Sequence, residues 1–522
     1  MAAKAFSAAG HLSKVPRIAA ENVRPGFVPF AQEELPACSL PKSLSEELAR
    51  LRDWMADHLR VSGVLTVAVA SLSTFCLGYN TGIVAGAQKG ISEDAAFGLG
   101  GLESGELVSC ALLAAAFGAF TGQVANVVGR RRALLGAALV FLCAPVLMAL
   151  APGFKLLLAA RTLSGMSIGV SSVLTNLYIT EVSPASCRGR LGGWAPFIGT
   201  SGILVSYVVS SSLQPLPMQA WRVQFGLGAL PAALQLLLSR NLPETPRWLL
   251  SQRRSEEAKG CLQRLFPEAA ESALDQELAR LEADLCQSAV ASVNTLGLCR
   301  KQHRASTIVG VSINVLQQVS GINVFIYFGP QILDDAGFGS YSMISTTVVS
   351  LIQLAATAVL IRYIDQIGRR PLALAGIIGM MLGLTLMVTG SLLRGAGLVI
   401  SVTAWFSLLG MLFFRAAFSL SLGPLPYVMT SEFFAQEARA AGVGFCWAMN
   451  WLANFGVSLS FPVLAEAIPG SDGQALIFGI YMFFCVVALV FVLLLLPETN
   501  GVSLEAVRLQ NSHSQESCDS AI

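Results

Sequence analysis

Three amide side chains within one apolar run are the residues of this 522-residue chain best placed to recognise a ligand. Gln317, Gln318 and Asn323 lie between Ile308 and Leu333, a run that contains no charged residue. In hydrocarbon each unmet amide donor or acceptor would cost several kcal/mol, so these side chains must line a cavity or face another helix. At about 100° per residue, Gln317 and Gln318 point in adjacent directions and Asn323 lies about 120° round from Gln317. A neutral polar stripe of this kind suits a neutral, hydroxyl-rich ligand.

The helix that carries these amides is expected to break, because Gly321 and Pro330 weaken it. Two later apolar segments add similar chemistry. The first contains the run 423–427 (GPLPY), which must kink or interrupt its helix. In the second, two amides share one helix face at an i, i+4 spacing. Aromatic faces stack on sugar rings and amides bond to hydroxyls, so the two segments complete a candidate polyol site with Tyr427, Asn450, Trp451 and Asn454. Taken singly, each is more often a packing residue.

A second set of chemically active residues consists of arginines and glutamates in short loops between apolar segments. These arginines are a topology signal in any case. A sharper hypothesis is a network of bidentate ion pairs that latches two halves of the protein together on the inner side. The candidate members are Arg130, Arg131, Glu181, Arg188, Glu244, Arg247, Arg369, Arg370, Glu432, Arg439 and Glu498.

The elements that position these residues are membrane-spanning helices. The chain is 54% hydrophobic and 13% charged, with a mean hydropathy of +0.63, whereas a soluble domain carries about 25% charged residues. Twelve segments are long enough to cross a hydrocarbon core of about 30 Å. They lie near 62–82, 104–125, 133–151, 156–179, 191–211, 221–239, 307–333, 342–362, 371–392, 397–428, 440–464 and 475–496.

The distribution of charge predicts the orientation. Short loops on one side carry eight arginines, and those on the other carry four basic residues. By the positive-inside rule both termini are cytosolic. No cysteine falls in an expected outer loop, so no disulfide framework is expected. The four histidines (His11, His58, His303 and His513) all lie outside the spans, and no metal-ligand spacing occurs.

An internal duplication follows from the order of the motifs. Gly129-Arg-Arg, Glu181 and Pro243-Glu-Thr recur as Gly368-Arg-Arg, Glu432 and Pro497-Glu-Thr, at offsets of 239, 251 and 254 residues. We therefore expect an all-α membrane protein with two six-helix halves in the same orientation. The expected division is a cytosolic tail with an amphipathic helix over Ser43 to Arg60 (1–60), a first half (61–240), a helical cytosolic linker (241–305), a second half (306–497) and a C-terminal tail (498–522).

The interior of the expected bundle lacks acids. Proton-driven carriers need a carboxylate or histidine that changes charge inside the membrane, but the first span has Asn80 where an acid could stand. Arg161 and Arg415 are the deep charges. Arg161 could pair with Glu181 or with helix carbonyls, whereas Arg415 could either extend toward the outer surface or line the pore. No nucleophile, base and orienting group occur together at mid-membrane, so we expect no catalytic residues and no enzyme.

Nine motifs in this order resemble the sugar porter family of the major facilitator superfamily, over about residues 62–507. They are GYNTG at 78, NVVGRR at 126, EVSPASCRGR at 181, PETPRWLL at 243, QQVSGINVFIYFGPQIL at 317, DQIGRR at 365, GPLPY at 423, NWLAN at 450 and PETNG at 497. The resemblance implies the major facilitator fold with twelve helices, alternating access by a rocker-switch motion, and a hexose or polyol bound between the halves.

The resemblance also assigns sugar contacts to Gln317, Gln318, Asn323, Asn450 and Trp451, and adds Gln353 in the eighth span. The chain departs from the family pattern in three ways. Tyr427 replaces a usual tryptophan. Pro196 stands where hexose carriers have a sugar-binding glutamine, which leaves room for another monosaccharide or a polyol. Asn80, included among the candidate contacts, stands where proton-coupled members carry aspartate, as in facilitative uniporters.

The sequence therefore predicts a facilitative carrier of a monosaccharide, with a sugar or polyol and the lipid bilayer as its partners. It predicts no nucleic acid, cofactor or metal, and it is compatible with a monomer. The plasma membrane is the favoured location, with an organelle membrane as the alternative. The alternative mechanism is proton-coupled sugar or inositol symport. An alternative of another class is a sugar sensor that does not transport.

Overall fold

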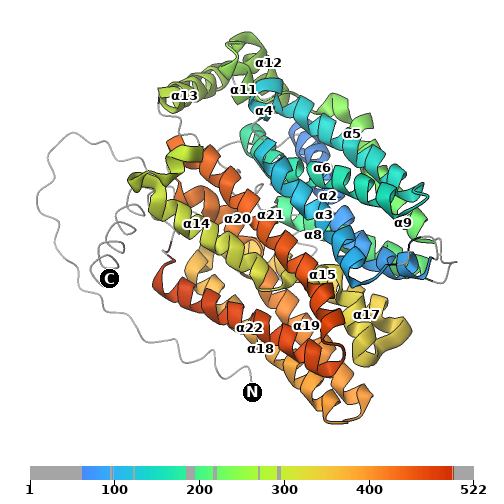
Figure 1. Cartoon of the computed structure of the whole chain (residues 1–522). Coiled ribbons are helices and arrows are strands. Elements are labelled where there is room, and N and C mark those ends of the chain that lie inside the picture. The colour runs from blue at the N-terminus through green and yellow to red at the C-terminus, as the bar shows by residue number, and fades with distance from the viewer. Residues whose placement is uncertain are drawn as a thin grey trace, which may run out of the picture. The chain divides into compact units, whose positions relative to one another are not determined.

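The computed structural model describes residues 61–94, 97, 99–121, 124–183, 194–214, 220–267, 271–290, 295–434, 436–496 and 498. All regular elements within these ranges are helices (Figure 1). The expected amphipathic helix at Ser43 to Arg60 lies outside the described residues, as do Arg188 and both tails apart from Glu498.

The first half contains the expected spans one to six. Its helices are α2 (Val61–Glu93), α3 (Gly101–Thr121), α4 (Ala125–Val128), α5 (Arg130–Ala149), α6 (Phe154–Val182), α8 (Trp194–Leu213), α9 (Ala220–Leu227), α10 (Ala229–Leu237) and the 3-10 turn η3 (Ser239–Asn241).

The sixth span differs from the expectation of one helix over 221–239, since it is split between α9 and α10. Pro231 explains the position of the split. A proline has no N–H to donate to the carbonyl four residues earlier, and its ring clashes with that carbonyl. The affected carbonyl belongs to Leu227, the last residue of α9.

The linker is helical in its described residues. Its elements are α11 (Pro246–Ser251), α12 (Ser255–Leu265), α13 (Glu271–Val290) and the 3-10 turn η4 (Thr295–Cys299). Thr245 caps α11 by accepting a hydrogen bond from the Trp248 N–H, and Pro246 occupies its first turn, where a missing N–H costs nothing.

The second half contains the remaining spans. Its elements are α14 (Lys301–Val319), α15 (Ile322–Tyr327), α16 (Gly329–Leu333), the π-helical turn η5 (Asp334–Phe338), the 3-10 turn η6 (Gly339–Tyr341), α17 (Ser342–Ile367), α18 (Arg369–Gly395), α19 (Ile400–Ser419), α20 (Leu425–Phe433), α21 (Gln436–Ala467) and α22 (Ser471–Leu494).

Both predicted helix breaks in the second half are confirmed. The seventh span is interrupted at Gly321, whose φ of +91° is in the left-handed region. A Cβ added there would lie 2.6 Å from the Tyr481 ring, so both the conformation and the packing require glycine. The tenth span is interrupted between Ser419 and Leu425, at the segment that contains Pro424.

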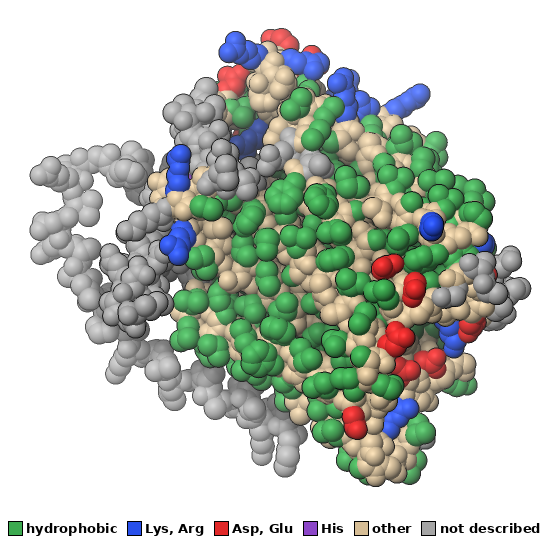
Figure 2. All heavy atoms as spheres, viewed as in Figure 1, with side chains coloured by type: hydrophobic (Ala, Val, Ile, Leu, Met, Phe, Trp, Pro, Cys, Tyr) green, Lys and Arg blue, Asp and Glu red, His purple; other side chains and the backbone are tan. Residues whose placement is uncertain are grey.

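The described helices agree with a membrane-spanning protein. Ten helical stretches among the described residues are long and apolar enough to cross a membrane. The two other expected spans correspond to α9 with α10 and to α21. Large apolar side chains such as Leu139, Leu382 and Val490 are about half exposed. Figure 2 shows hydrophobic side chains over most of the visible face, with basic side chains gathered near α11, α12 and α13.

The helices pack both within each half and between the two halves. In the first half α2 packs on α8 and α3 on α6, while in the second α18 packs on α19 and α22. The halves meet where α3 packs on α21 and α8 on α17 (Figure 1). The duplication extends to backbone detail, because Gly129 before α5 and Gly368 before α18 have φ values of +103° and +92°.

Candidate functional site

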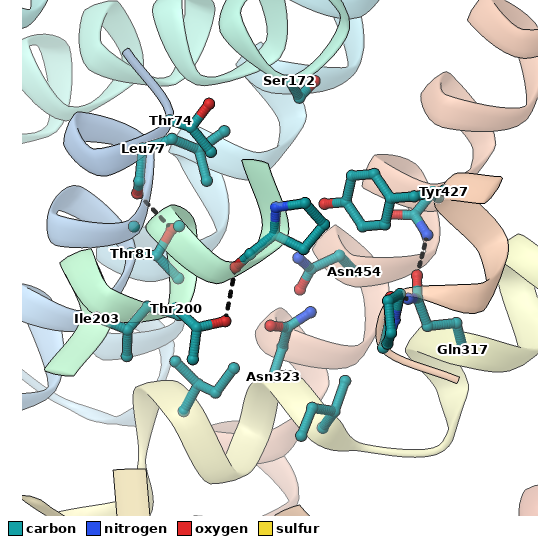
Figure 3. Close-up of a pocket in the computed structure, with 18 of the residues that line it drawn as sticks. Thr74, Leu77, Thr81, Ser172, Thr200, Ile203, Gln317, Asn323, Tyr427 and Asn454 are labelled. Carbon is teal, nitrogen blue, oxygen red and sulfur yellow. Dashed lines mark hydrogen bonds between the residues drawn. The ribbon is translucent and has the colours of Figure 1, made fainter. Parts of the chain in front are cut away.

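A cavity of about 160 Å³ lies between the halves, where the sequence predicted a ligand site. The first half contributes residues of α2, α6 and α8, and the second contributes residues of α14, α15, α17, α19, α20, α21 and the interruption before α20 (Figure 3). None of the described residues that line it carries a charged or imidazole side chain. Its polar lining residues are Thr74, Thr81, Ser171, Ser172, Asn176, Thr200, Gln317, Gln318, Asn323, Tyr327, Gln353, Thr357, Ser419, Tyr427, Asn450 and Asn454, with the indoles of Trp447 and Trp451.

The two glutamines and Asn450 form one hydrogen-bonded network at the broken part of the tenth span. Gln317 Nε2 donates to the carbonyls of Leu422 and Gly423 at 2.7 and 2.9 Å. These carbonyls lack helical partners because the helix is interrupted there. Asn450 Nδ2 donates to Gln317 Oε1 at 2.7 Å, and Gln318 Nε2 donates to Asn450 Oδ1 at 2.9 Å. The network fixes the orientation of each amide.

Two asparagines at the centre of the cavity keep hydrogen-bonding capacity for a ligand. Asn323 Nδ2 donates to Gln318 Oε1, which leaves the Asn323 oxygen as an acceptor. Asn454 Oδ1 accepts from the Ser458 hydroxyl at 3.0 Å, and its NH₂ group bonds to Tyr327 with one N–H, which leaves the second N–H as a donor. The two side chains face one another across the space in Figure 3. Together the two side chains offer a ligand hydroxyl one donor, the Asn454 NH₂ group, and one acceptor, the Asn323 oxygen.

Aromatic rings form another part of the wall. Tyr427 packs against Trp447, with ring centroids 4.2 Å apart. The Trp451 indole N–H donates to the Ser172 hydroxyl at 3.3 Å, which joins the two halves beside the cavity. Trp447 was not predicted from the sequence. Its i−4 spacing from Trp451 is the signal that could have identified it.

Sequence reasoning missed most of the wall from the first half. Thr74, Ser172 and Thr200 line the cavity there. Hydroxyls of this kind are hard to predict, since they can bond to their own helix and so occur on any face. Pro196 also lines the cavity, and its carbonyl accepts the Thr200 hydroxyl at 2.9 Å. The surface at the position of the missing glutamine is therefore small and hydroxyl-bearing.

Asn80 is not one of the residues that line the cavity, which corrects its assignment as a ligand contact. Its side chain donates to the Cys76 carbonyl one turn earlier at 2.9 Å. Its own carbonyl accepts from Arg161 Nη1 at 2.8 Å. Of the two partners expected for Arg161, the structure shows the helix carbonyl.

Arg415 is fully buried, so the interpretation that it extends toward the outer surface is wrong. Its Nε donates to Gln353 Oε1 at 2.8 Å, and its guanidinium lies 5.7 Å from the centroid of the Tyr207 ring. Arg415 itself is not a lining residue, whereas Gln353 is. Because arginine only donates, Gln353 must turn its oxygen toward Arg415, and its NH₂ group remains available to the cavity. The missed signal is the spacing of 254 residues from Arg161, which equals the offset of the Pro-Glu-Thr motifs.

The charged residues predicted on the inner side form two equivalent clusters. Arg130 donates to both oxygens of Glu181 at 3.1 and 3.3 Å. The corresponding pair in the second half is Arg369 with Glu432, at 3.3 Å.

In each cluster a further glutamate caps the helix that begins at the paired arginine. Glu244 accepts the backbone N–H groups of Arg130 and Arg131 at the start of α5. Glu498 accepts those of Arg369 and Arg370 at the start of α18. A carboxylate at a helix N-terminus satisfies free N–H groups and the positive end of the helix dipole.

The Arg130–Glu181 and Arg369–Glu432 pairs each join residues of one half, and the capping glutamates belong to the segment that follows it, Glu244 to the linker and Glu498 to the C-terminal tail. The short loops explain this, because each sets the arginine at a helix start beside the neighbouring helix of the same half. A latch between the halves stays a prediction for another conformation. Of the other predicted members, Arg439 Nε donates to the Phe434 carbonyl at 3.4 Å, and Arg247 lies in α11.

A second hollow, of about 990 Å³, lies on the side predicted to face outward, and Tyr327 lines both it and the central cavity. The halves are joined on this side by Lys89 to Asp334 at 3.3 Å and by the Gly101 N–H to Glu466 at 3.0 Å. Deeper, the Tyr207 hydroxyl donates to the Ile326 carbonyl at 2.6 Å. These contacts hold the two halves together on this side.

Comparison with known proteins gives one consistent result. A family model described as sugar (and other) transporter matches residues 66–509. The D-xylose transporter of Levilactobacillus brevis is 31% identical over 451 residues, covering 86% of this chain and 95% of the relative. The galactose-proton symporter of Escherichia coli strain K12 is 30% identical, covering 84% and 92%. A structure of the partially occluded inward open conformation of the xylose transporter XylE from Escherichia coli is 27% identical, with a TM-score of 0.72 and coverages of 84% and 99%.

Proposed function

The chain belongs to the sugar (and other) transporter family, and from that premise we propose that its central cavity carries a monosaccharide or a related polyol by facilitative uniport. It is a multi-pass membrane transporter of the major facilitator superfamily, and it is not an enzyme. The proposal concerns the substrate contacts, the coupling mechanism and the gate.

The observation that carries the proposal is the lining of the cavity. Amides, hydroxyls and aromatic rings line it, without a charged side chain among the described lining residues. A neutral polyhydroxy compound needs both donors and acceptors, and an apolar ring face complements the C–H face of a sugar. We assign the amide contacts to Gln318, Asn323, Gln353 and Asn454, and the stacking surface to Tyr427 and Trp451.

Gln317 and Asn450 have a different role in this proposal. Gln317 uses its NH₂ group on two backbone carbonyls, and Asn450 bonds to both glutamines. They hold Gln318 in place and keep the broken tenth span in position. Replacing either therefore disturbs the geometry of the site as well as direct contacts with the sugar.

Uniport is favoured because the described residues of the cavity wall include no carboxylate and no imidazole that could bind and release a proton. Asn80 cannot change charge, and the nearby Arg161 bonds to a backbone carbonyl. An arginine keeps its proton in proteins and so cannot serve as a carrier of protons. The favoured location is the plasma membrane, with both termini in the cytosol.

Proton-coupled symport is the second candidate, because a relative 30% identical is a galactose-proton symporter. One experiment separates the two mechanisms. Purified protein in liposomes is tested with a panel of labelled monosaccharides and polyols, with and without a pH gradient and an uncoupler. Uniport predicts uptake that stops at equal concentrations and is unchanged by the uncoupler. Accumulation above equilibrium that the uncoupler abolishes would replace uniport with symport.

The inner clusters complete the proposal. Each holds the ends of several helices of one half together through ion pairs and helix caps. We infer that the halves consequently move as two bodies around the sugar, which exposes the cavity to one side at a time.

A further inference from the structure

A third hollow, of about 430 Å³, lies apart from the sugar cavity, between the start of α5 and the linker helices α11 and α12. Five arginines line it: Arg131, Arg132, Arg240, Arg254 and Arg264. Only two acids, Glu244 and Glu257, are among the described lining residues. Figure 2 shows basic side chains gathered in this region of the molecule.

The two acids neutralise this set of arginines only in part, because Glu244 is occupied by backbone N–H groups and Glu257 pairs with a single member of the set, Arg254. Glu244 accepts three backbone N–H groups, from Arg130, Arg131 and Thr245, at 2.9 to 3.1 Å. Glu257 is bound by Arg254 through two contacts of 2.7 and 2.6 Å. Two full carboxylates face five guanidiniums, so the lining carries a net positive charge.

Arg131 shows the imbalance most directly. Its Nε is buried and has no hydrogen-bond partner, and its Nη2 reaches only the Ser239 carbonyl at 3.4 Å. A buried donor without a partner carries a free-energy cost. Cys261 adds no negative charge, since burial raises the pKa of its thiol to about 12 and the thiol donates to the Glu244 carbonyl at 3.0 Å.

The positive-inside rule explains why inner loops are basic, but it does not explain convergence on one concave surface. The arginines come from the start of α5, from η3 after the sixth span, and from both ends of α12. Trp248 and Leu249 supply an apolar part of the same wall. Several guanidiniums around one hollow are the arrangement that binds phosphate, because their planar forks match its oxygens.

We propose that this hollow binds a phosphate group on the cytosolic side of the transporter. The phosphate could be supplied by the headgroup of an anionic lipid in the inner leaflet or by a soluble phosphate compound. In either case the anion bridges α5 and α12, and it lies beside Glu244, which caps α5. Occupancy therefore ties the linker to the inner end of the first half.

The test uses the full-length purified protein and two probes. One is labelled inorganic phosphate, measured by equilibrium dialysis. The other is short-chain phosphatidylinositol 4-phosphate, measured by native mass spectrometry. Binding of the lipid alone identifies a headgroup site, and binding of both probes identifies a general phosphate site.

The test variant is the triple replacement Arg132→Gln, Arg240→Gln and Arg264→Gln, whose side chains are exposed and lie outside the proposed gate clusters. The matched control is Arg280→Gln, Arg300→Gln and Arg304→Gln, which removes the same charge outside the hollow. At about fivefold per arginine, we expect the three replacements of the test variant to weaken binding by roughly 100-fold and the control to bind as the wild type. Thermal unfolding of both variants checks that they fold.

Two results would overturn the proposal: neither probe binds the wild type, or both triple variants lose binding equally, which would mean general attraction to basic surface. The sugar transport assay is independent of this test. A failure here leaves the transport proposal intact, and the reverse also holds.

Discussion

Replacing Arg415 by methionine tests how a buried charge outside the cavity sets the chemistry inside it. Arg415 contacts a side chain of the cavity wall at Gln353, whose oxygen it binds at 2.8 Å. Without that bond the Gln353 amide can rotate, and binding the sugar must then order it. Ordering one such side chain costs about 0.5–1.5 kcal/mol, so the apparent substrate constant should rise about 2- to 13-fold.

The same variant should not lose stability. Arg415 is buried, and its contacts among the described residues are the Gln353 oxygen and the Tyr207 ring rather than a carboxylate. Removing a buried charge that no carboxylate balances is neutral or stabilising when an apolar group fills the space. We therefore expect an unchanged or higher unfolding temperature beside the weaker apparent affinity.

The assay is zero-trans uptake in liposomes for the wild type, Arg415→Met, Gln353→Ala and the double variant. Because Arg415 acts through Gln353, the double variant should resemble Gln353→Ala alone. Sugar analogues add a specific readout. Since Gln353 presents a donor, fluorine in place of one hydroxyl should be tolerated better than hydrogen in the wild type, and Arg415→Met should lose this preference. An equal increase from Arg415→Met in both backgrounds, or a fall in unfolding temperature that accounts for the loss, would refute this reasoning.

Three further replacements have defined outcomes. Gln318→Ala should raise the apparent substrate constant about 5- to 150-fold in uptake assays, since a buried amide loses about 1–3 kcal/mol of hydrogen bonding; unchanged kinetics would remove it from the site. Glu181→Gln should lower the free energy of unfolding by about 3–5 kcal/mol, because it leaves the largely buried Arg130 without its ion pair. The control is Glu257→Gln, which removes an exposed ion pair and should cost less than about 1 kcal/mol. Equal shifts of the two variants in thermal unfolding would contradict this. Gly321→Ala should lower the free energy of unfolding by at least about 1–2 kcal/mol because of the left-handed backbone at Gly321, and by more because of the clash with Tyr481. The control is Gly444→Ala, where a Cβ meets nothing within 4 Å. Similar transport and stability in the two variants would argue that the helix break does not require glycine at 321.

Features that depend on local backbone chemistry were predictable from the sequence. Gly321 and Pro424 lie where the two helices break, because glycine and proline change the backbone wherever they occur. The amides of the seventh span line a cavity because hydrocarbon cannot satisfy them. The same rule could have placed the split at Pro231, but apolar length alone suggested one continuous helix.

Features that depend on which side chains meet were not predictable. The sequence does not reveal that Gln317 donates to the Leu422 and Gly423 carbonyls and so holds the broken tenth span in position beside the cavity. Asn80 was predicted to contact the ligand because of its position in a motif, yet its side chain donates a hydrogen bond to the Cys76 carbonyl of its own helix. Arg415 had two open interpretations, and the partner that explains it, Gln353, is 62 residues away along the chain.

The central claim is that uncharged amides between the two halves bind an uncharged sugar. Its most direct test is equilibrium binding of the best transported sugar to the purified protein, by isothermal titration of the wild type and Asn323→Ala side by side. The account predicts saturable binding at one site, about 5- to 150-fold weaker in the variant, for a loss of about 1–3 kcal/mol. Equal dissociation constants for the two proteins would contradict it.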